Sequence, residues 1–279
     1  MSTLSTEPAL AKLLLRDRVL LVGGLVVVTI ATWAYTIDMA WGGHGSHASG
    51  QHAEHAHHAH HGMAHSVSAM LTPHAEHQMS VGMLIVMWIV MMIAMMLPSA
   101  GPVGMLHARF VRAKNGGEPA YLTGMFLVGY CVVWAGFSTV AALVQAYLER
   151  SQLMSPVAMA LFSSVAGGIT LVVAGAFQFS PWKNACLHQC RTPIGFLMTE
   201  WQDGASGSFV MGLKNGLFCL GCCWAIMALL FVGGVMSMLW MAGLTALMLI
   251  EKIAPHGDRV AKAAGVAMII GGVFMLFSG

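Results

Sequence analysis

The chain has 279 residues, and only 9% of them are charged (13 Lys and Arg against 11 Asp and Glu), whereas about a quarter of a typical soluble domain is charged. Hydrophobic residues make up 57% of the chain, and its formal net charge is +2. This composition excludes a soluble globular domain, a disordered chain and a nucleic-acid-binding protein. It predicts an all-α fold, a polytopic bundle of transmembrane helices.

Apolar segments that reach the length of about 20 residues needed to span a bilayer recur along the chain. We predict about seven spans in a single integral membrane domain covering residues 1–279: 19–37, 81–106, 120–147, 157–179, 209–232, 235–250 and 260–277. The apolar stretch 209–253 is too long for one span, and Gly233–Gly234 near its middle predicts a tight turn. The first helix shows no convincing small-x-small cleavage site, so we expect a retained anchor rather than a signal peptide.

The positions of Lys and Arg predict how the chain is oriented. They occur before the first helix and after the second, fourth and sixth, whereas the loop 42–80 has neither. Because cytoplasmic loops carry the excess of Lys and Arg, we predict a cytoplasmic N-terminus and a multi-pass protein of the bacterial inner membrane. Six spans would place Lys252 outside, which favours the turn at Gly233.

The outer loop 42–80 is rich in histidine. It contains 11 of the 14 histidines among Gly, Ala and Ser, which have little to bury, so we expect a flexible segment. Neutral imidazole is the commonest metal ligand, and such tracts are typical of binding Cu(II), Zn(II) or Ni(II). The candidate ligands are His44, His47, His57, His58, His60 and His61. The alternative is an incidental polar loop or a pH-sensitive tether.

Methionines recur at a spacing of four in the second predicted helix, at positions 79, 83, 87, 91 and 95. On an α-helix this spacing forms a slowly winding stripe. Thioethers are soft ligands that favour Cu(I). The candidate ligands are methionines of this stripe, two neighbours of it and two residues at the outer end of the first helix: Met87, Met91, Met92, Met95, Met96, Asp38 and Met39. Packing against other helices is the alternative.

Five of the six cysteines lie in two short motifs. Cys219, Cys222 and Cys223 are spaced so that two or three sulfurs share one face of a helix, and Cys186 and Cys190 lie in a predicted inner loop. Paired thiols on the reducing side of a membrane bind metal or act in redox chemistry more often than they form structural disulfides. All five are therefore predicted metal ligands, and reversible disulfide chemistry is the alternative.

Motifs of soluble enzymes are absent from the sequence, including the Walker loop, the dinucleotide fingerprint, G-x-S-x-G and H-E-x-x-H. Asp and Glu are too few and scattered for a carboxylate pair, so no catalytic residue is predicted. Charges near the bilayer are costly and usually paired, and we predict a pair between Lys214 and Glu251.

Four stretches together resemble a bacterial family of predicted metal-binding integral membrane proteins whose function is not established. They are WIVMMIAMMLP at 88–98, KNACLHQCRTP at 183–193, GLFCLGCCW at 216–224 and MLIEK at 248–252. The resemblance implies metal binding by Met92, Met95, Met96 and the five cysteines of the two motifs, and it implies no reaction. The His-rich loop is not part of the family pattern.

Imidazole, thioether and thiolate donors follow one another from the outer loop inward, in order of increasing softness. We therefore predict a protein that binds and handles a metal, copper before zinc or another transition metal, with the loop collecting it, the Met stripe passing Cu(I) and the cysteines receiving it. The alternatives are an accessory subunit of a larger membrane oxidoreductase, such as a copper enzyme, and a membrane thiol–disulfide oxidoreductase. Predicted partners are the lipid bilayer, metal ions, and either partner membrane subunits or further copies of the chain.

Overall fold

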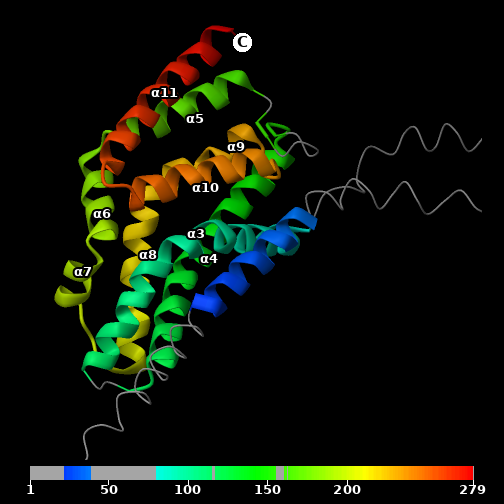
Figure 1. The fold of residues 1–279 in the computed structure, drawn as a ribbon. Coiled ribbons are helices and arrows are strands. Elements are labelled where there is room, and N and C mark those ends of the chain that lie inside the picture. The colour runs from blue at the N-terminus through cyan, green and yellow to red at the C-terminus, as the bar shows by residue number, and fades with distance from the viewer. Residues whose placement is uncertain (1–21, 39–79, 115–116, 155–159, 162, 279) are drawn as a thin grey trace, which may run out of the picture.

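The computed structural model describes residues 22–38, 80–114, 117–154, 160–161 and 163–278 (Figure 1). In these ranges the chain is built from α-helices, and its one extended pairing is an isolated bridge between Met154 and Leu161. The prediction of an all-α fold is confirmed for this part of the chain. The predicted ligands Met39, His44, His47, His57, His58, His60 and His61 lie outside it.

Most of the helices follow the predicted apolar segments, while two short ones, Pro181–Arg191 and Pro193–Thr199, lie between two of these segments. In chain order they are Val22–Asp38, α3 (Val81–Ala113), α4 (Pro119–Arg150), α5 (Ser164–Phe177), α6 (Pro181–Arg191), α7 (Pro193–Thr199), α8 (Gly204–Ala228), α9 (Leu230–Gly233), α10 (Met238–Ile253) and α11 (Gly257–Ser278). Among the described helices, α3, α4, α8 with α9, and α11 are long and apolar enough to cross a membrane. These are the helices of a membrane protein, while the count of seven spans stays a prediction.

Two breaks divide the apolar segments of the second half. Gly234 has a φ of 91°, a conformation that glycine adopts readily, and it separates α9 from α10, so the predicted turn is confirmed. Within the predicted span 157–179 the helix α5 covers Ser164–Phe177, and it is followed at a bend of 63° by α6, whose first residue is Pro181. The Ser180 hydroxyl accepts a hydrogen bond from the Trp182 amide, which explains why a new helix begins here.

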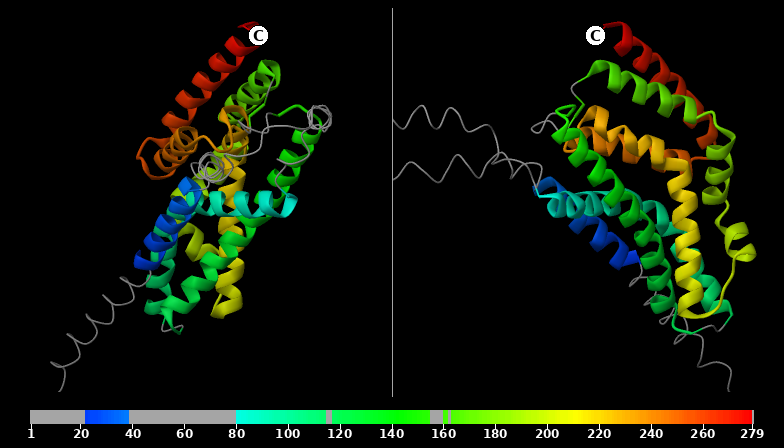
Figure 2. Two further views of the ribbon diagram at one scale, coloured as in Figure 1. Left: turned by 90° about the vertical axis from the view of Figure 1, so that its right-hand side faces the viewer. Right: turned by 180° about the vertical axis from the view of Figure 1, so that it is seen from behind.

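Helix α3 changes direction along its length (Figure 2) and contains Pro98 and Pro102. Pro98 has no N–H to offer to the carbonyl of Ala94, four residues earlier. The indole of Trp33 donates to that carbonyl at 3.1 Å instead. The bend in α3 therefore provides the acceptor that docks helix Val22–Asp38.

Glycines set the closest helix contacts. A Cβ atom at Gly129 of α4 or Gly212 of α8 would collide with the backbone of the facing helix. At Gly168 of α5 a Cβ would lie 2.8 Å from the carbonyl of Gly272 in α11. Small residues allow membrane helices to approach in this way, and Figure 1 shows α5 and α11 side by side.

A buried ion pair joins α6 to α10. Lys183 Nζ lies 2.7 Å from Glu251 Oε2, and Gln178 Nε2 donates to Glu251 Oε1 at 3.1 Å. The predicted pair between Lys214 and Glu251 is wrong. Lys214 pairs with Glu200 in the segment just before α8, because the carboxylate of Glu251 is directed toward α6.

Candidate metal centre

Three buried thiols share one stretch of α8. Cys222 Sγ lies 3.2 Å from Cys223 Sγ and 3.1 Å from the carbonyl oxygen of Cys219, and the side chains of Cys219 and Cys223 also interact. None of the three side chains is more than 2% exposed. The i, i+3 and i+4 spacing thus places these sulfurs on one protected part of the helix, as the sequence predicts.

Two further thiols reach this stretch from α6. Cys186 and Cys190 belong to a helix rather than to the predicted loop, and their i+4 spacing puts them on one face of it. The thiol of Cys190 interacts with that of Cys222. A Cβ atom at Gly221 would lie 2.8 Å from Cys186 Sγ, so the glycine makes room for this sulfur. We call Cys186, Cys190, Cys219, Cys222 and Cys223 the thiol centre.

Polar groups of two helices contact the sulfur of Cys219, and a third helix contributes a hydroxyl to the same network. Lys252 Nζ of α10 lies 3.0 Å from it and 3.1 Å from Ser99 Oγ of α3. Tyr130 of α4 places its hydroxyl 3.0 Å from the same sulfur and donates to the carbonyl of Met96 at 3.1 Å. An ammonium in this position offsets negative charge on the thiol centre.

Lys252, Tyr130 and Ser99 are not among the predicted site residues. The available signal was a pair of adjacent charges, Glu251 and Lys252, at the end of an apolar helix, because buried charges in membrane helices are usually paired or functional. Sequence alone does not show that the two side chains face different helices.

The predicted methionine ligands of α3 belong to the same buried cluster as the three cysteines of α8. Met87, Met91, Met92, Met95 and Met96 are each at most 2% exposed. The stripe does not extend to Met83, which is 54% exposed. Both the ligand and the packing interpretation require burial, so metal binding by these methionines stays a prediction.

The predicted ligand Asp38 is not part of the buried cluster that contains the three cysteines of α8. Asp38 is exposed at the end of helix Val22–Asp38. Within the described residues, no three or more side chains of His, Cys, Asp and Glu form a group that could hold a metal ion. A complete ligand set would therefore draw on donors of other kinds, and the buried thioethers are the soft donors in the same cluster.

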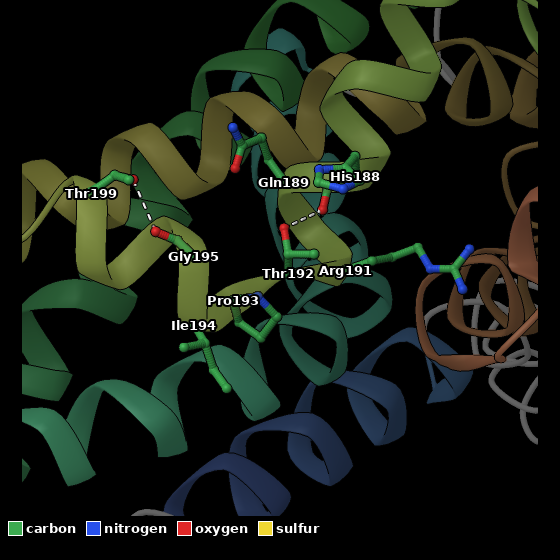
Figure 3. A pocket seen from close by; sticks show the side chains of 8 residues that line it. All are labelled: His188, Gln189, Arg191, Thr192, Pro193, Ile194, Gly195 and Thr199. Carbon is green, nitrogen blue, oxygen red and sulfur yellow. Dashed lines mark hydrogen bonds between the residues drawn. The ribbon is translucent and has the colours of Figure 1, made fainter.

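A cavity of about 660 Å³ lies at the junction of α6 and α7 (Figure 3). Its lining residues are His188, Gln189, Arg191, Thr192, Pro193, Ile194, Gly195 and Thr199. His188 is two residues from each cysteine of α6 and so lies on another face of that helix. Arg191 donates to the carbonyls of Ala254 and Pro255, each at 2.8 Å. The cavity is thus separate from the thiol centre.

A buried histidine that was not predicted lies in a second cluster. His107 of α3 stacks between the rings of Phe126 and Trp201, with centroids 5.0 and 5.6 Å away, and its Nδ1 is 3.2 Å from Thr123 Oγ1. Its Nε2 has no hydrogen-bond partner in the described part of the chain.

A comparison with known proteins identifies one matching family. The family PpoB2, described as "Copper chaperone", matches residues 85–275, which include the thiol centre, Lys252 and the buried methionines of α3. No curated protein and no solved structure matches the chain. The match supports the general prediction of a metal-handling protein. Because it covers more than half of the sequence, the chain belongs to the PpoB2 family of copper chaperones.

Proposed function

We propose that the protein binds Cu(I) in the thiol centre and holds it inside the membrane for transfer. The observation that carries this proposal is the approach of α6 to the cysteines of α8, where Gly221 makes room for the sulfur of Cys186 and Lys252 Nζ lies 3.0 Å from Cys219 Sγ. Membership of a copper chaperone family supports copper as the cargo.

The surroundings suit a soft monovalent ion. Thiolates are soft ligands and select Cu(I) over hard cations. Two thiolates with one Cu(I) leave a net negative charge, and an unpaired buried charge is costly. Lys252 lies 3.0 Å from Cys219 Sγ, where its positive charge offsets that excess.

The proposal includes a route for the ion. The His-rich loop, residues 42–80, collects copper on the outer side, the buried methionines of α3 pass Cu(I), and the thiol centre receives it. The seven-span topology, the cytoplasmic N-terminus and the bacterial inner membrane belong to the same proposal, since they place the loop outside and the thiols toward the reducing side.

Removing the thiols of α8 tests the proposal. We expect purified full-length protein to take Cu(I) from a chromophoric chelator, and the triple variant Cys219→Ser, Cys222→Ser, Cys223→Ser to lose this tight binding. Cys131→Ser is the matched control, because Cys131 is a partly buried thiol of α4 outside both motifs. Equal copper content in the triple variant and the wild type would contradict the proposal.

Thiol–disulfide exchange is a second candidate, favoured by the contact between Cys190 and Cys222 on different helices. It predicts that mild oxidation removes two titratable thiols and that a copper chelator does not change the result. Protection of the thiols by Cu(I) would favour the copper site instead.

A further inference from the structure

Three helices meet at one level around Lys252 of α10. Its Nζ lies 3.1 Å from Ser99 Oγ of α3 and 3.0 Å from Cys219 Sγ of α8. These contacts fix which residues of α3, α8 and α10 lie at the same height.

A second set of contacts gives the direction of each helix from that level. Trp88 of α3 packs on Phe231 of α9, with ring centroids 5.2 Å apart, and Trp240 at the start of α10 donates to the carbonyl of Leu229 at 2.8 Å. Toward α9 the residue numbers therefore rise along α8 and fall along α3 and α10. Figure 1 shows α9 and α10 next to one another.

One turn nearer to α9, each of the three helices presents a sulfur. Residues four apart lie on the same helix face, about 6 Å apart along the axis. Met95 lies four residues before Ser99, Cys223 lies four after Cys219, and Met248 lies four before Lys252. They are 1%, 2% and 2% exposed and belong to one buried cluster. Met248 therefore lies on the same face of α10 as Lys252, and its thioether is not among the predicted ligands.

We infer that Met95, Cys223 and Met248 form a three-sulfur binding site for a soft monovalent cation, Cu(I) or Ag(I). The inference rests on the proposed function and adds Met248 and the ligand set to it. Cys223 gives up its thiol proton on binding, so that its thiolate and the monovalent ion together add no charge. The negative charge that Lys252 offsets is then that of a second thiolate of the thiol centre, Cys219, whose sulfur lies 3.0 Å from Lys252 Nζ. Two thioethers complete the site without further charge and favour Cu(I) over harder ions.

Leucine substitutions separate a ligand from a packing residue. Leucine keeps the size of methionine, so Met248→Leu and Met95→Leu preserve the packing and remove only the donor. Met211→Leu is the matched control, because Met211 is a fully buried methionine of α8 in the second cluster, with its sulfur accepting from the Gln202 amide.

The test is a Cu(I) titration of each purified full-length variant against a chromophoric chelator. We expect Met248→Leu and Met95→Leu to raise the Kd at least about tenfold, the lower range for losing a contact that only supports a metal site. Met211→Leu should leave the Kd unchanged, and copper-edge X-ray absorption should show one sulfur fewer in Met248→Leu than in the wild type. If the wild type binds Cu(I) and both leucine variants match the Met211→Leu control, this inference fails while the proposed function stands. A wild type that does not bind Cu(I) overturns both.

Discussion

A buried lysine, Lys183, and a half-buried one, Lys252, lie beside the same turn of α10 and have different surroundings. Lys183 lies 2.7 Å from Glu251, which also accepts a hydrogen bond from Gln178, so the positive charge meets a carboxylate. Lys252, the next residue of α10, contacts the thiol of Cys219 and the hydroxyl of Ser99. In the described part of the chain no carboxylate is shown within ion-pair distance of Lys252. The first lysine closes a structural pair, and the second is the charge that offsets the proposed copper site.

The two lysines differ in the partner that each charge meets. A charge within a membrane helix costs free energy, and the group that it contacts indicates whether it stabilises the fold or takes part in ligand binding. The same distinction applies to methionine. Met211 is as buried as the methionines of α3, but its sulfur accepts a hydrogen bond at 3.3 Å from the Gln202 amide. Burial alone does not identify a ligand, whereas nearby thiols together with a charge offset favour one.

The largest effect is expected from removing the paired lysine. Lys183→Met leaves the carboxylate of Glu251 buried without a cation, and breaking such a pair costs about 3–5 kcal/mol of folding free energy. We expect a large drop in the melting temperature of the detergent-solubilised protein. The double variant Lys183→Met, Glu251→Met should recover most of the stability, since apolar replacement of both partners is often neutral. A Lys183→Met variant that melts like the wild type would refute the structural role of this pair.

An intermediate effect is expected at Lys252, where we expect a change in the affinity for Cu(I) rather than in the stability of the fold. Lys252→Met removes the charge beside Cys219, and we expect the Kd for Cu(I) to rise about tenfold, equivalent to about 1.4 kcal/mol. Lys252→Arg keeps the charge and should keep most of the affinity. The melting temperature of the copper-free Lys252→Met protein should fall less than that of Lys183→Met. Unchanged Cu(I) affinity in Lys252→Met would show that the ammonium has no part in the metal centre.

The helices could be predicted from the sequence because their cause is local. Apolar runs predicted spans at 81–106 and 120–147, and α3 and α4 cover both, as Val81–Ala113 and Pro119–Arg150. The start of α6 at Pro181 was also readable, since Ser180 precedes a proline at the first helical position. The sequence analysis nevertheless places the cysteines of α6 in a loop, because the segment after residue 179 contains Lys183 and Arg191 and lies between two apolar spans.

The partners of the charged residues could not be predicted in the same way. Lys214 lies on one predicted span and Glu251 at the end of the next, but Lys214 pairs with Glu200 and Glu251 with Lys183. Which face of α10 meets α6 and which meets α8 depends on packing, and hydropathy contains no such information. The contact between Lys252 and Cys219 has the same origin.

The smallest change in stability and in Cu(I) affinity is expected at Tyr130. This residue separates the contribution of hydrogen bonding near Cys219 from that of the lysine charge. Tyr130→Phe removes a hydroxyl 3.0 Å from the Cys219 sulfur and 3.1 Å from the carbonyl of Met96. That carbonyl keeps the hydrogen bond from Ser99 Oγ at 2.8 Å, so the loss should be about 1 kcal/mol in stability. Because the hydroxyl has no net charge, the Kd for Cu(I) should change less than in Lys252→Met, measured in the same chelator titration. If Tyr130→Phe weakens copper binding more than Lys252→Met does, then hydrogen bonding rather than the lysine charge controls the thiol centre.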